Sequence, residues 1–345
     1  MTRILAVRLD SDGDVLLTGP ALRALAFGAA RLDLLVSPAG EQAARLLPGP
    51  HEVIVFDAPW SGYRPPRLDP AAFTDLVARL RRAAYDRAVV FTSFHQSPLP
   101  MALLAKLAGI PYVAATSEDY PGSLLDLRHR RVARHEVEAA LELARATGAR
   151  LPADDDSRLA VLPLSTDASG VVSSGPLVVV HPGASVPSRA LRADHARRIV
   201  SALLDSGWDV AVTGAPAERD LVRQATAPGA LDLTGRTSLA ELAAVLRRAA
   251  CLVAGNTGPA HLAAAVGTPV VSMFSPVVPV ERWHPYGVPS VVLGDQDAAC
   301  RDTRARECPI PGHPCLGEVE PAEVVAAVES LVAEGRPATT RAGAA

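Results

Sequence analysis

The sequence predicts an α/β protein made of two doubly wound domains, each with a parallel sheet. Short apolar runs alternate with helical patterns along most of the chain. A chain of 345 residues exceeds what a single core usually holds. A stretch rich in Asp, Ser, Gly and Pro at 151–176 interrupts the alternation, as an interdomain connection does. We therefore expect domains at 1–165 and 176–333 and a disordered tail at 334–345.

Composition excludes several classes of protein. Nearly half of the residues are hydrophobic (49%) and the net charge is only -3, so we expect a globular protein that does not bind nucleic acid. No apolar run is long enough to span a bilayer, and Arg8 interrupts the opening run, so we expect no anchor or signal peptide and a cytoplasmic location. The single lysine, Lys106, is not in a Gly-Lys-Ser/Thr triplet, which excludes a P-loop.

The first strand and helix enclose a cluster of aspartates. The run 3–8 predicts a strand and 14–26 a helix, with Asp10, Asp12 and Asp14 in or just after the turn between them. An aspartate at a helix N-terminus is a preferred cap, and this alternative explains one of the three. The others lie where open α/β sheets bind ligands, at the carboxyl edge of a strand.

The first half continues as strands and helices in alternation. The patterns predict strands at 32–36, 53–56 and 87–91, and helices at 73–84, 100–108 and 135–147. The polar loop 92–97 follows the strand at 87–91, at the same sheet edge as Asp14, and is a candidate ligand-binding loop. The basic run 128–131 is interpreted as a solvated face, with a docking patch for an acidic ligand or a membrane surface as the alternative.

The second half repeats the alternation. A buried strand from Leu177 runs into the turn His181-Pro-Gly-Ala-Ser185. Further strands are predicted at 209–213 and 231–234, and helices at 194–206, 239–249 and 321–333, with a short helix ending at Ala225.

The stretch 251–274 organises this half. It predicts a strand, a turn at Asn256-Thr257-Gly258, a helix at 260–266 and a second strand. The unpaired N–H groups and positive dipole end of such a helix suit a diphosphate. Gly258 permits close approach, and Thr257 and His261 can add donors. The alternative is an ordinary helix cap with His261 as a core histidine.

A segment at 300–315 contains a formal Cys₃His set, made up of Cys300, Cys308, His313 and Cys315. Its spacing does not match the paired zinc knuckle. We therefore expect no metal site but a proline-braced surface loop of free thiols.

Five motifs together resemble glycosyltransferase family 9, the heptosyltransferases of lipopolysaccharide core assembly and their relatives. They are Arg8-Leu-Asp-Ser-Asp-Gly-Asp-Val-Leu-Leu-Thr-Gly-Pro-Ala-Leu22, His181-Pro-Gly-Ala-Ser185, Thr213-Gly-Ala-Pro-Ala-Glu218, Leu233-Thr-Gly-Arg-Thr-Ser-Leu239 and Asn256-Thr-Gly-Pro-Ala-His-Leu-Ala-Ala-Ala265. Their order and spacing carry the resemblance, which runs from about residue 3 to about residue 333.

The resemblance implies a GT-B fold, two Rossmann-like domains facing a cleft. It implies inverting transfer of a sugar without a metal or other cofactor. The donor would be a nucleotide sugar, ADP-heptose. The acceptor would be a glycan, a lipid-linked molecule or a small molecule. The reaction would take place in the cytoplasm or at the inner face of the cytoplasmic membrane. Asp14 would be the general base, and Ser11, Gly13 and His95 would lie on the acceptor side. The nucleotide-sugar contacts would be Ser185, Arg189, Glu218, Thr237, Asn256, Thr257, Gly258 and His261.

The chain departs from the family pattern at three places. Arg189 replaces the family's lysine, and the Trp-Pro pair that follows is absent, with Leu191 in that stretch. Asn256 replaces an aspartate that helps to position the donor sugar. Arginine can still neutralise a diphosphate. Two alternatives stay open: a nucleotide-sugar epimerase of similar architecture, and a non-catalytic nucleotide-sugar-binding relative. We also expect the stretch 276–286, with Arg282, Trp283 and His284, to lie beside the donor. Packing of Trp283 in the core is the alternative.

Overall fold

The computed structural model describes residues 2–62, 65–93, 95–131, 133–164 and 175–335. The chain divides into two compact units, Met1–Pro163 with Glu281–Tyr286, and Leu164–Val280 with Gly287–Ala345. Each contains one parallel sheet covered by helices, which confirms the predicted α/β class. The predicted tail lies outside the described residues except for 334 and 335, and so does part of the predicted connection at 151–176, from 165 to 174.

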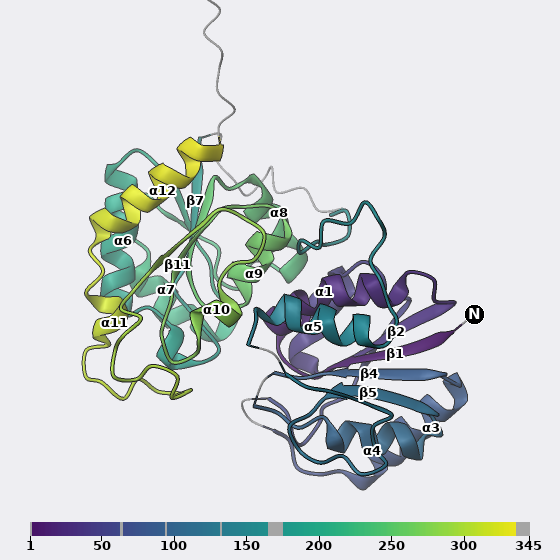
Figure 1. Ribbon diagram of the computed structural model, residues 1–345. Helices are drawn as coiled ribbons and strands as arrows, with labels where there is room; N and C mark the ends of the chain where they lie inside the picture. Colours follow the sequence, from purple (N-terminus) through teal and green to yellow (C-terminus); the bar gives the residue numbers. More distant parts are fainter. Residues whose placement is uncertain (1, 63–64, 94, 132, 165–174, 336–345) are drawn as a thin grey trace, which may run out of the picture. The chain divides into compact units, whose positions relative to one another are not determined.

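The first unit is built on a sheet of six parallel strands in the order β3-β2-β1-β4-β5-β6 (Figure 1). The strands are β1 (Arg3–Arg8), β2 (Arg31–Val36), β3 (Glu52–Val55), β4 (Arg87–Phe91), β5 (Tyr112–Thr116) and β6 (Leu127–His129). The sequence predicted β1 to β4 but not β5 or β6. β6 has three half-buried residues and no alternating pattern, so only its pairing with β5 defines it.

Helices cover both faces of this sheet. They are α1 (Asp12–Ala26), α2 (Glu41–Leu46), α3 (Pro70–Ala83), α4 (Leu99–Leu107) and α5 (Glu136–Ala146), with a 3₁₀ turn, η1 (Pro38–Gly40). α1 and α5 pack side by side on one face, and α3 and α4 lie on the other (Figure 1). α1 begins two residues before the predicted start, because Ser11 and not a later residue occupies its N-cap.

The turn after β1 is locked by its neighbours. A Cβ on Gly40 would lie 2.7 Å from Val15 Cγ2 and 2.8 Å from the Asp10 carbonyl oxygen, so only glycine lets η1 pack this closely. Ser37 Oγ donates to the same carbonyl at 2.8 Å. Two contacts from the connection after β2, the packing of Gly40 and the hydrogen bond from Ser37, therefore hold the backbone of Asp10 in place.

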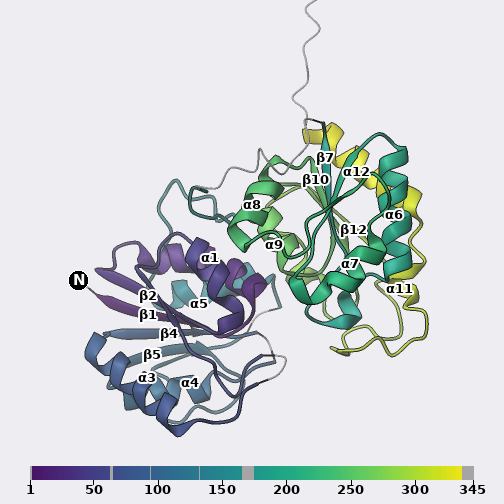
Figure 2. The same cartoon turned by 180° about the vertical axis from the view of Figure 1, so that it is seen from behind.

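The second unit has the same architecture, with strand order β12-β11-β10-β7-β8-β9. Its strands are β7 (Leu177–His181), β8 (Asp209–Val212), β9 (Leu231–Asp232), β10 (Cys251–Gly255), β11 (Val270–Met273) and β12 (Ser290–Leu293). Its helices are α6 (Ala193–Asp205), α7 (Arg219–Ala225), α8 (Leu239–Arg248), α9 (Gly258–Ala265), α11 (Pro314–Gly317) and α12 (Pro321–Gly335), with 3₁₀ turns η2 (Pro187–Arg189) and η3 (Pro216–Glu218). The short helix α10 (Val280–Trp283) belongs to the first unit except for its first residue. Figure 2 shows α8 and α9 on one face and α6, α7 and α12 on the other.

Both sheets reverse their strand order at one point. Counted within each unit, the order is 3-2-1-4-5-6, so the switch falls between β1 and β4 and between β7 and β10. The connections leave these neighbouring strands in opposite directions and open a crevice at their carboxyl ends, where doubly wound sheets bind ligands. The loops after β1, β4, β7 and β10 are therefore the places to look for a site.

The first unit contains a buried hydrogen bond whose loss should be measurable. Tyr85 donates to Asp33 Oδ2 at 2.7 Å, and both side chains are nearly inaccessible, at 4% and 1%. Tyr85→Phe removes the donor and leaves the carboxylate less satisfied, so urea unfolding should show a loss of about 1–3 kcal/mol. Tyr120→Phe, at a side chain 85% exposed, is the control. Equal midpoints for the two variants would contradict this account.

Candidate functional site

A buried arginine organises the switch point of the first unit. Arg8 is the last residue of β1 and only 3% exposed. Its Nε lies 2.8 Å from Asp10 Oδ2, and its Nη2 donates to Asp14 Oδ1 and to Ser93 Oγ, both at 3.0 Å. One guanidinium thus connects the loop after β1, the first turn of α1 and the loop after β4.

The charges of this cluster depend on one another. Burial lowers the pKa of Arg8, but Asp10, Asp14 and Glu136 outweigh burial and raise it above its ordinary value, so Arg8 is cationic. Burial raises the pKa of Asp10 to about 6, with Arg8 opposing the shift and Asp14 adding to it. A buried arginine with several anionic partners keeps its charge without the large cost of an isolated ion.

Each aspartate of the cluster has a different partner. Asp12 Oδ1 accepts from Ala43 N at 2.9 Å, which ties α1 to α2. Asp14 lies in the first turn of α1, 22% exposed, with its carboxylate held by Arg8 and 3.4 Å from Ser11 Oγ. The alternative that Asp14 merely caps the helix is wrong, because Ser11 holds the N-cap position and the carboxylate turns to the arginine. Asp14 combines a fixed orientation with access to solvent.

The loop after β4 lies against this cluster, as predicted. Gln96 Nε2 donates to Asp10 Oδ1 at 2.6 Å, and Gln96 Oε1 accepts from Ser93 N at 3.1 Å. This loop borders a pocket of about 200 Å³, whose lining is His95, Gln96, Ser97, Thr116, Ser117, Glu118, Asp119 and Arg131. His95 is an exposed lining residue, Ser11 is exposed and Gly13 is buried in α1. Neither Ser11 nor Gly13 lines the pocket.

The interpretation of 128–131 as a solvated face fits Arg130, which is 64% exposed, but is wrong for Arg128 and Arg131. Arg131 is 11% exposed, lies 3.6 Å from Glu136 Oε1 and donates to the Thr92 carbonyl oxygen at 3.2 Å. Arg128 donates to the carbonyl oxygens of Ser117 and Glu118. The run forms strand β6 and its exit, so tertiary contacts occupy two of its three arginines, Arg128 and Arg131.

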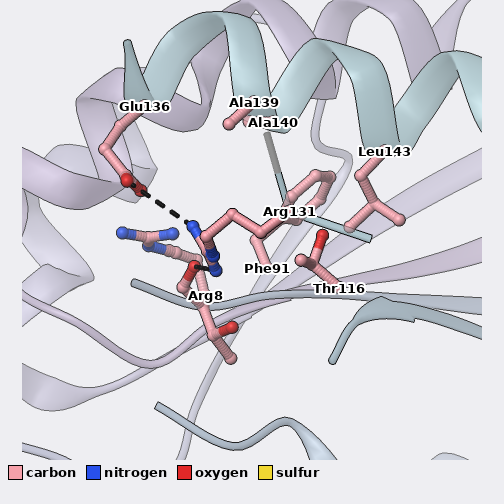
Figure 3. A pocket seen from close by; sticks show the side chains of 9 residues that line it. Arg8, Phe91, Thr116, Arg131, Glu136, Ala139, Ala140 and Leu143 are labelled. Atoms are coloured by element: carbon pink, nitrogen blue, oxygen red, sulfur yellow. Dashed lines mark hydrogen bonds and ion pairs between the residues drawn. The ribbon is translucent and has the colours of Figure 1, made fainter. Parts of the chain in front are cut away.

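Arg8, Arg131 and Glu136 converge on a second, much smaller cavity (Figure 3). Its volume is about 20 Å³, enough for about one water molecule. Thr92 Oγ1 is buried there without a hydrogen-bond partner among the described residues, which suits such a water. Sequence reasoning assigned no role to Arg8, Arg131 or Glu136. A charge at the end of an apolar strand, followed by three aspartates, was a usable signal for Arg8; nothing in the local pattern marked the other two.

The segment Glu281–Tyr286 packs within the first unit. Arg282 Nη1 lies 3.6 Å from Glu136 Oε1, and His135 Nε2 lies 2.9 Å from the His284 carbonyl oxygen. The rings of His135 and Tyr286 are 4.7 Å apart. This part of 276–286, expected beside the donor, contacts the N-terminus of α5 through partners of the first unit.

The switch point of the second unit joins β10 to α9. Thr257 is the extended N-cap residue, without a side-chain cap bond, and a proline follows in the first turn, as predicted. Asn256 is 5% exposed; its Nδ2 lies 3.5 Å from the Ser275 carbonyl oxygen, and its Oδ1 accepts from Ser275 N at 3.3 Å. The amide of Asn256 therefore joins the loops after β10 and β11.

Glycine brings η2 to the same place. A Cβ on Gly255 would lie 2.5 Å from the Arg189 carbonyl oxygen, so the turn that carries Arg189 packs directly on the end of β10. Arg189 is half-buried, Gly258 starts α9, and His261 is 5% exposed in the same helix. The structure thus brings Arg189 close to the start of α9, although the two are far apart in the sequence.

A second group lies at the ends of β7 and β8. His181 Nδ1 is 3.0 Å from Thr213 Oγ1, and its Nε2 is 3.8 Å from Glu218 Oε2. Burial lowers the pKa of His181, against the effect of Glu218. A side chain at Gly183 would overlap the Glu218 carboxylate. Ser185 is exposed beyond this turn, and Thr237 is half-buried directly before the N-cap of α8.

The cysteine segment supports η2 instead of offering a surface loop. Ser188 N donates to the Arg306 carbonyl oxygen at 3.0 Å, and its Oγ donates to that of Ala305. Its three cysteines are free, but Cys300 and Cys315 are buried, so the expected exposed thiols are wrong for these two. Burial raises the pKa of Cys315 to about 12, with Cys300 and Cys308 adding to the shift, which disfavours the metal-binding thiolate.

In the described part of the chain, no group of three or more His, Cys, Asp or Glu side chains could hold a metal ion, and His313 and the three cysteines form no such group. None of its helices has the length and apolarity needed to cross a membrane.

Comparison with known proteins identifies the family. The sequence profile described as glycosyltransferase family 9 (heptosyltransferase) matches residues 73–313. Lipopolysaccharide heptosyltransferase 3 of Escherichia coli K12 is 29% identical over 171 residues, 48% of each chain. Lipopolysaccharide heptosyltransferase 1 of Pseudomonas aeruginosa is 28% identical over 326 residues, 89% of this chain and 87% of that protein. The match thus spans about half the length of the Escherichia coli relatives.

A solved structure confirms the fold. The Escherichia coli ADP-heptose lipopolysaccharide heptosyltransferase II superposes with a TM-score of 0.74 at 19% identity, covering 96% of this chain and 99% of the other. At that identity the likeness shows the two-domain fold alone.

The Asn256 amide predicts a cost for the aspartate of the family pattern. An ionised aspartate at this position could accept from Ser275 N but would face the Ser275 carbonyl oxygen without a proton to donate. Asn256→Asp should therefore lose about 1–3 kcal/mol in chemical unfolding at pH 7. Because the folded state raises the pKa of this carboxyl, the deficit should shrink as pH falls and vanish below the unfolded value of about 3.9. A deficit independent of pH would refute this explanation of the asparagine.

Proposed function

We propose, from the premise that this chain belongs to glycosyltransferase family 9, that it transfers heptose from ADP-heptose to an acceptor hydroxyl with inversion and without a metal. The observation that carries the proposal is the partly exposed carboxylate of Asp14, oriented by the buried Arg8 at the switch point of a doubly wound sheet. The known relatives are named as lipopolysaccharide heptosyltransferases, which supports the sugar and the nucleotide.

Asp14 would act as the general base. As the acceptor oxygen attacks the anomeric carbon, its proton passes to Asp14, and the bond between that carbon and the diphosphate oxygen breaks to release ADP. Attack opposite the leaving group inverts the anomeric centre. Arg8 keeps the carboxylate in one orientation, which a base needs to meet a hydroxyl within hydrogen-bond distance.

The second unit would bind the nucleotide sugar. The start of α9 offers backbone N–H groups and the Thr257 hydroxyl to the diphosphate, and Arg189, packed on β10, adds a cation. These fixed donors would stabilise the charge on departing ADP. The remaining contacts are proposed at Glu218 for the ribose, Thr237 for the adenine region, and Ser185, Asn256, Gly258 and His261 for the diphosphate and sugar.

The first unit would bind the acceptor. The pocket beside Gln96 has a polar lining and a volume of about 200 Å³, which suits the hydroxyl groups of a sugar. His95 lines it, and Ser11 lies beside Asp14. We propose that the acceptor is a glycan, a lipid-linked molecule or a small molecule. The enzyme would bind it in the cytoplasm or at the inner face of the cytoplasmic membrane.

Asp14→Asn tests the proposal. The amide retains the shape of the side chain but cannot accept the proton, so ADP release from ADP-heptose should fall by roughly 100-fold or more with the best acceptor from a panel of sugars and lipid-linked glycans. Asp12→Asn is the matched control, since Asp12 lies in the same helical turn but contacts α2. Near-normal kcat in Asp14→Asn would refute the base.

The same assay separates the alternatives. Conversion of the sugar without ADP release would indicate an epimerase, and binding of ADP-heptose without turnover would indicate a non-catalytic relative. Either outcome would refute the proposed transfer.

Metal independence makes a separate prediction. The residues proposed around the diphosphate are Arg189, Asn256, Thr257, Gly258 and His261, none of which supplies the carboxylate oxygens that Mg²⁺ or Mn²⁺ prefers. EDTA should therefore leave initial rates within about twofold, because fixed donors supply the charge compensation. Loss of activity that Mg²⁺ or Mn²⁺ restores would contradict the proposal.

A further inference from the structure

The buried carboxylate of Glu136 lies among three arginines that come from distant parts of the sequence. Glu136 is the first residue of α5 and 4% exposed. Its Oε1 lies 3.6 Å from Nη1 of Arg131, after β6, and 3.6 Å from Nη1 of Arg282, in the segment Glu281–Tyr286. Arg8 lines the same small cavity as Glu136 and Arg131 and interacts with Glu136 electrostatically (Figure 3).

Glu136 supplies a negative charge beside Arg131 and Arg282. Burial raises the pKa of its carboxyl, but Arg8, Arg131 and Arg282 oppose this shift and favour the charged form. Without the glutamate, Arg131 and Arg282 would lose this neighbouring carboxylate, while Asp10 and Asp14 stay on Arg8. Arg131 and Arg282 would then repel Arg8 in surroundings that screen charge poorly. Exposed Glu118 also acts on Arg131, but from solvent, where screening is strong.

We propose that Glu136 is a positioning residue for Asp14. By holding Arg131 and Arg282 it leaves Arg8 to its two aspartates, and so it fixes the Arg8 to Asp14 contact of 3.0 Å. The inference rests on the proposed function, because it describes a residue that acts on the proposed base. α1 and α5 pack side by side. A change of charge at Glu136, the first residue of α5, therefore acts on Asp14, in the first turn of α1, through the arginines between them.

The variant Glu136→Gln tests this role, because glutamine has the same shape and no charge. We expect kcat for ADP release to fall about 10- to 100-fold, the scale for a misplaced catalytic group, while the KM for ADP-heptose stays within about twofold. A merely structural loss would raise this KM as well as lower kcat.

Glu138→Gln is the matched control. Glu138 lies in the same first turn of α5 and has the same effect on the helix dipole, but it does not line the cavity. Equal losses in the two variants, or a KM for ADP-heptose that rises along with the loss of kcat in Glu136→Gln, would overturn the inference.

A second test compares crystal structures of two variants, so it does not depend on activity or on the folding of one variant alone. In a crystal structure of the single variant Glu136→Gln, the Arg8 to Asp14 contact should be lost. The double variant, Glu136→Gln with Arg282→Gln, removes one charge of each sign, so its crystal structure should show this contact at least partly restored. An unchanged contact in the single variant, or no recovery in the double variant, would overturn the inference. Failure of wild-type protein to release ADP would refute the proposed function and leave this structural test intact.

Discussion

A buried positive charge at the end of a central strand is the constraint on which the first unit depends. Arg8 is surrounded by protein, so its guanidinium must find anionic and hydroxyl partners or the strand could not end there. It finds them in three separate segments: the loop after β1, the first turn of α1 and the loop after β4. Those segments consequently have one arrangement, and the carboxylate of Asp14 has one orientation.

The second unit reaches the same kind of order by different means. At its switch point, glycine contacts and one amide join the loops. Gly255 lets η2 touch the end of β10, and Asn256 bonds to the backbone of the loop after β11. These neutral contacts add no negative charge beside the positive end of the α9 dipole, which favours an anionic ligand there.

The two switch points therefore differ in charge although their topology is the same. The first surrounds the buried Arg8 with carboxylates, an arrangement suited to holding a proton acceptor in place. The second presents N–H groups, hydroxyls and a cation, an arrangement suited to a diphosphate. A transfer reaction needs both environments, one for the incoming hydroxyl and one for the leaving group.

The sequence by itself determined the fold class and the positions at which we propose the sites. Periodicity revealed the alternating strands and helices, and strand ends followed by Asp, Gly and Asn marked the carboxyl edges, because these are local patterns set by backbone geometry. The five motifs placed Asp14 and the start of α9 in the family pattern, and Arg189 stands where family members carry a lysine. Only the tertiary structure decided which charges meet. Arg131 looked solvated and Arg282 looked like part of the donor side, yet both approach Glu136, from segments far apart in the sequence. Burial and pairing of charges arise from contacts between distant segments, and no local pattern contains them.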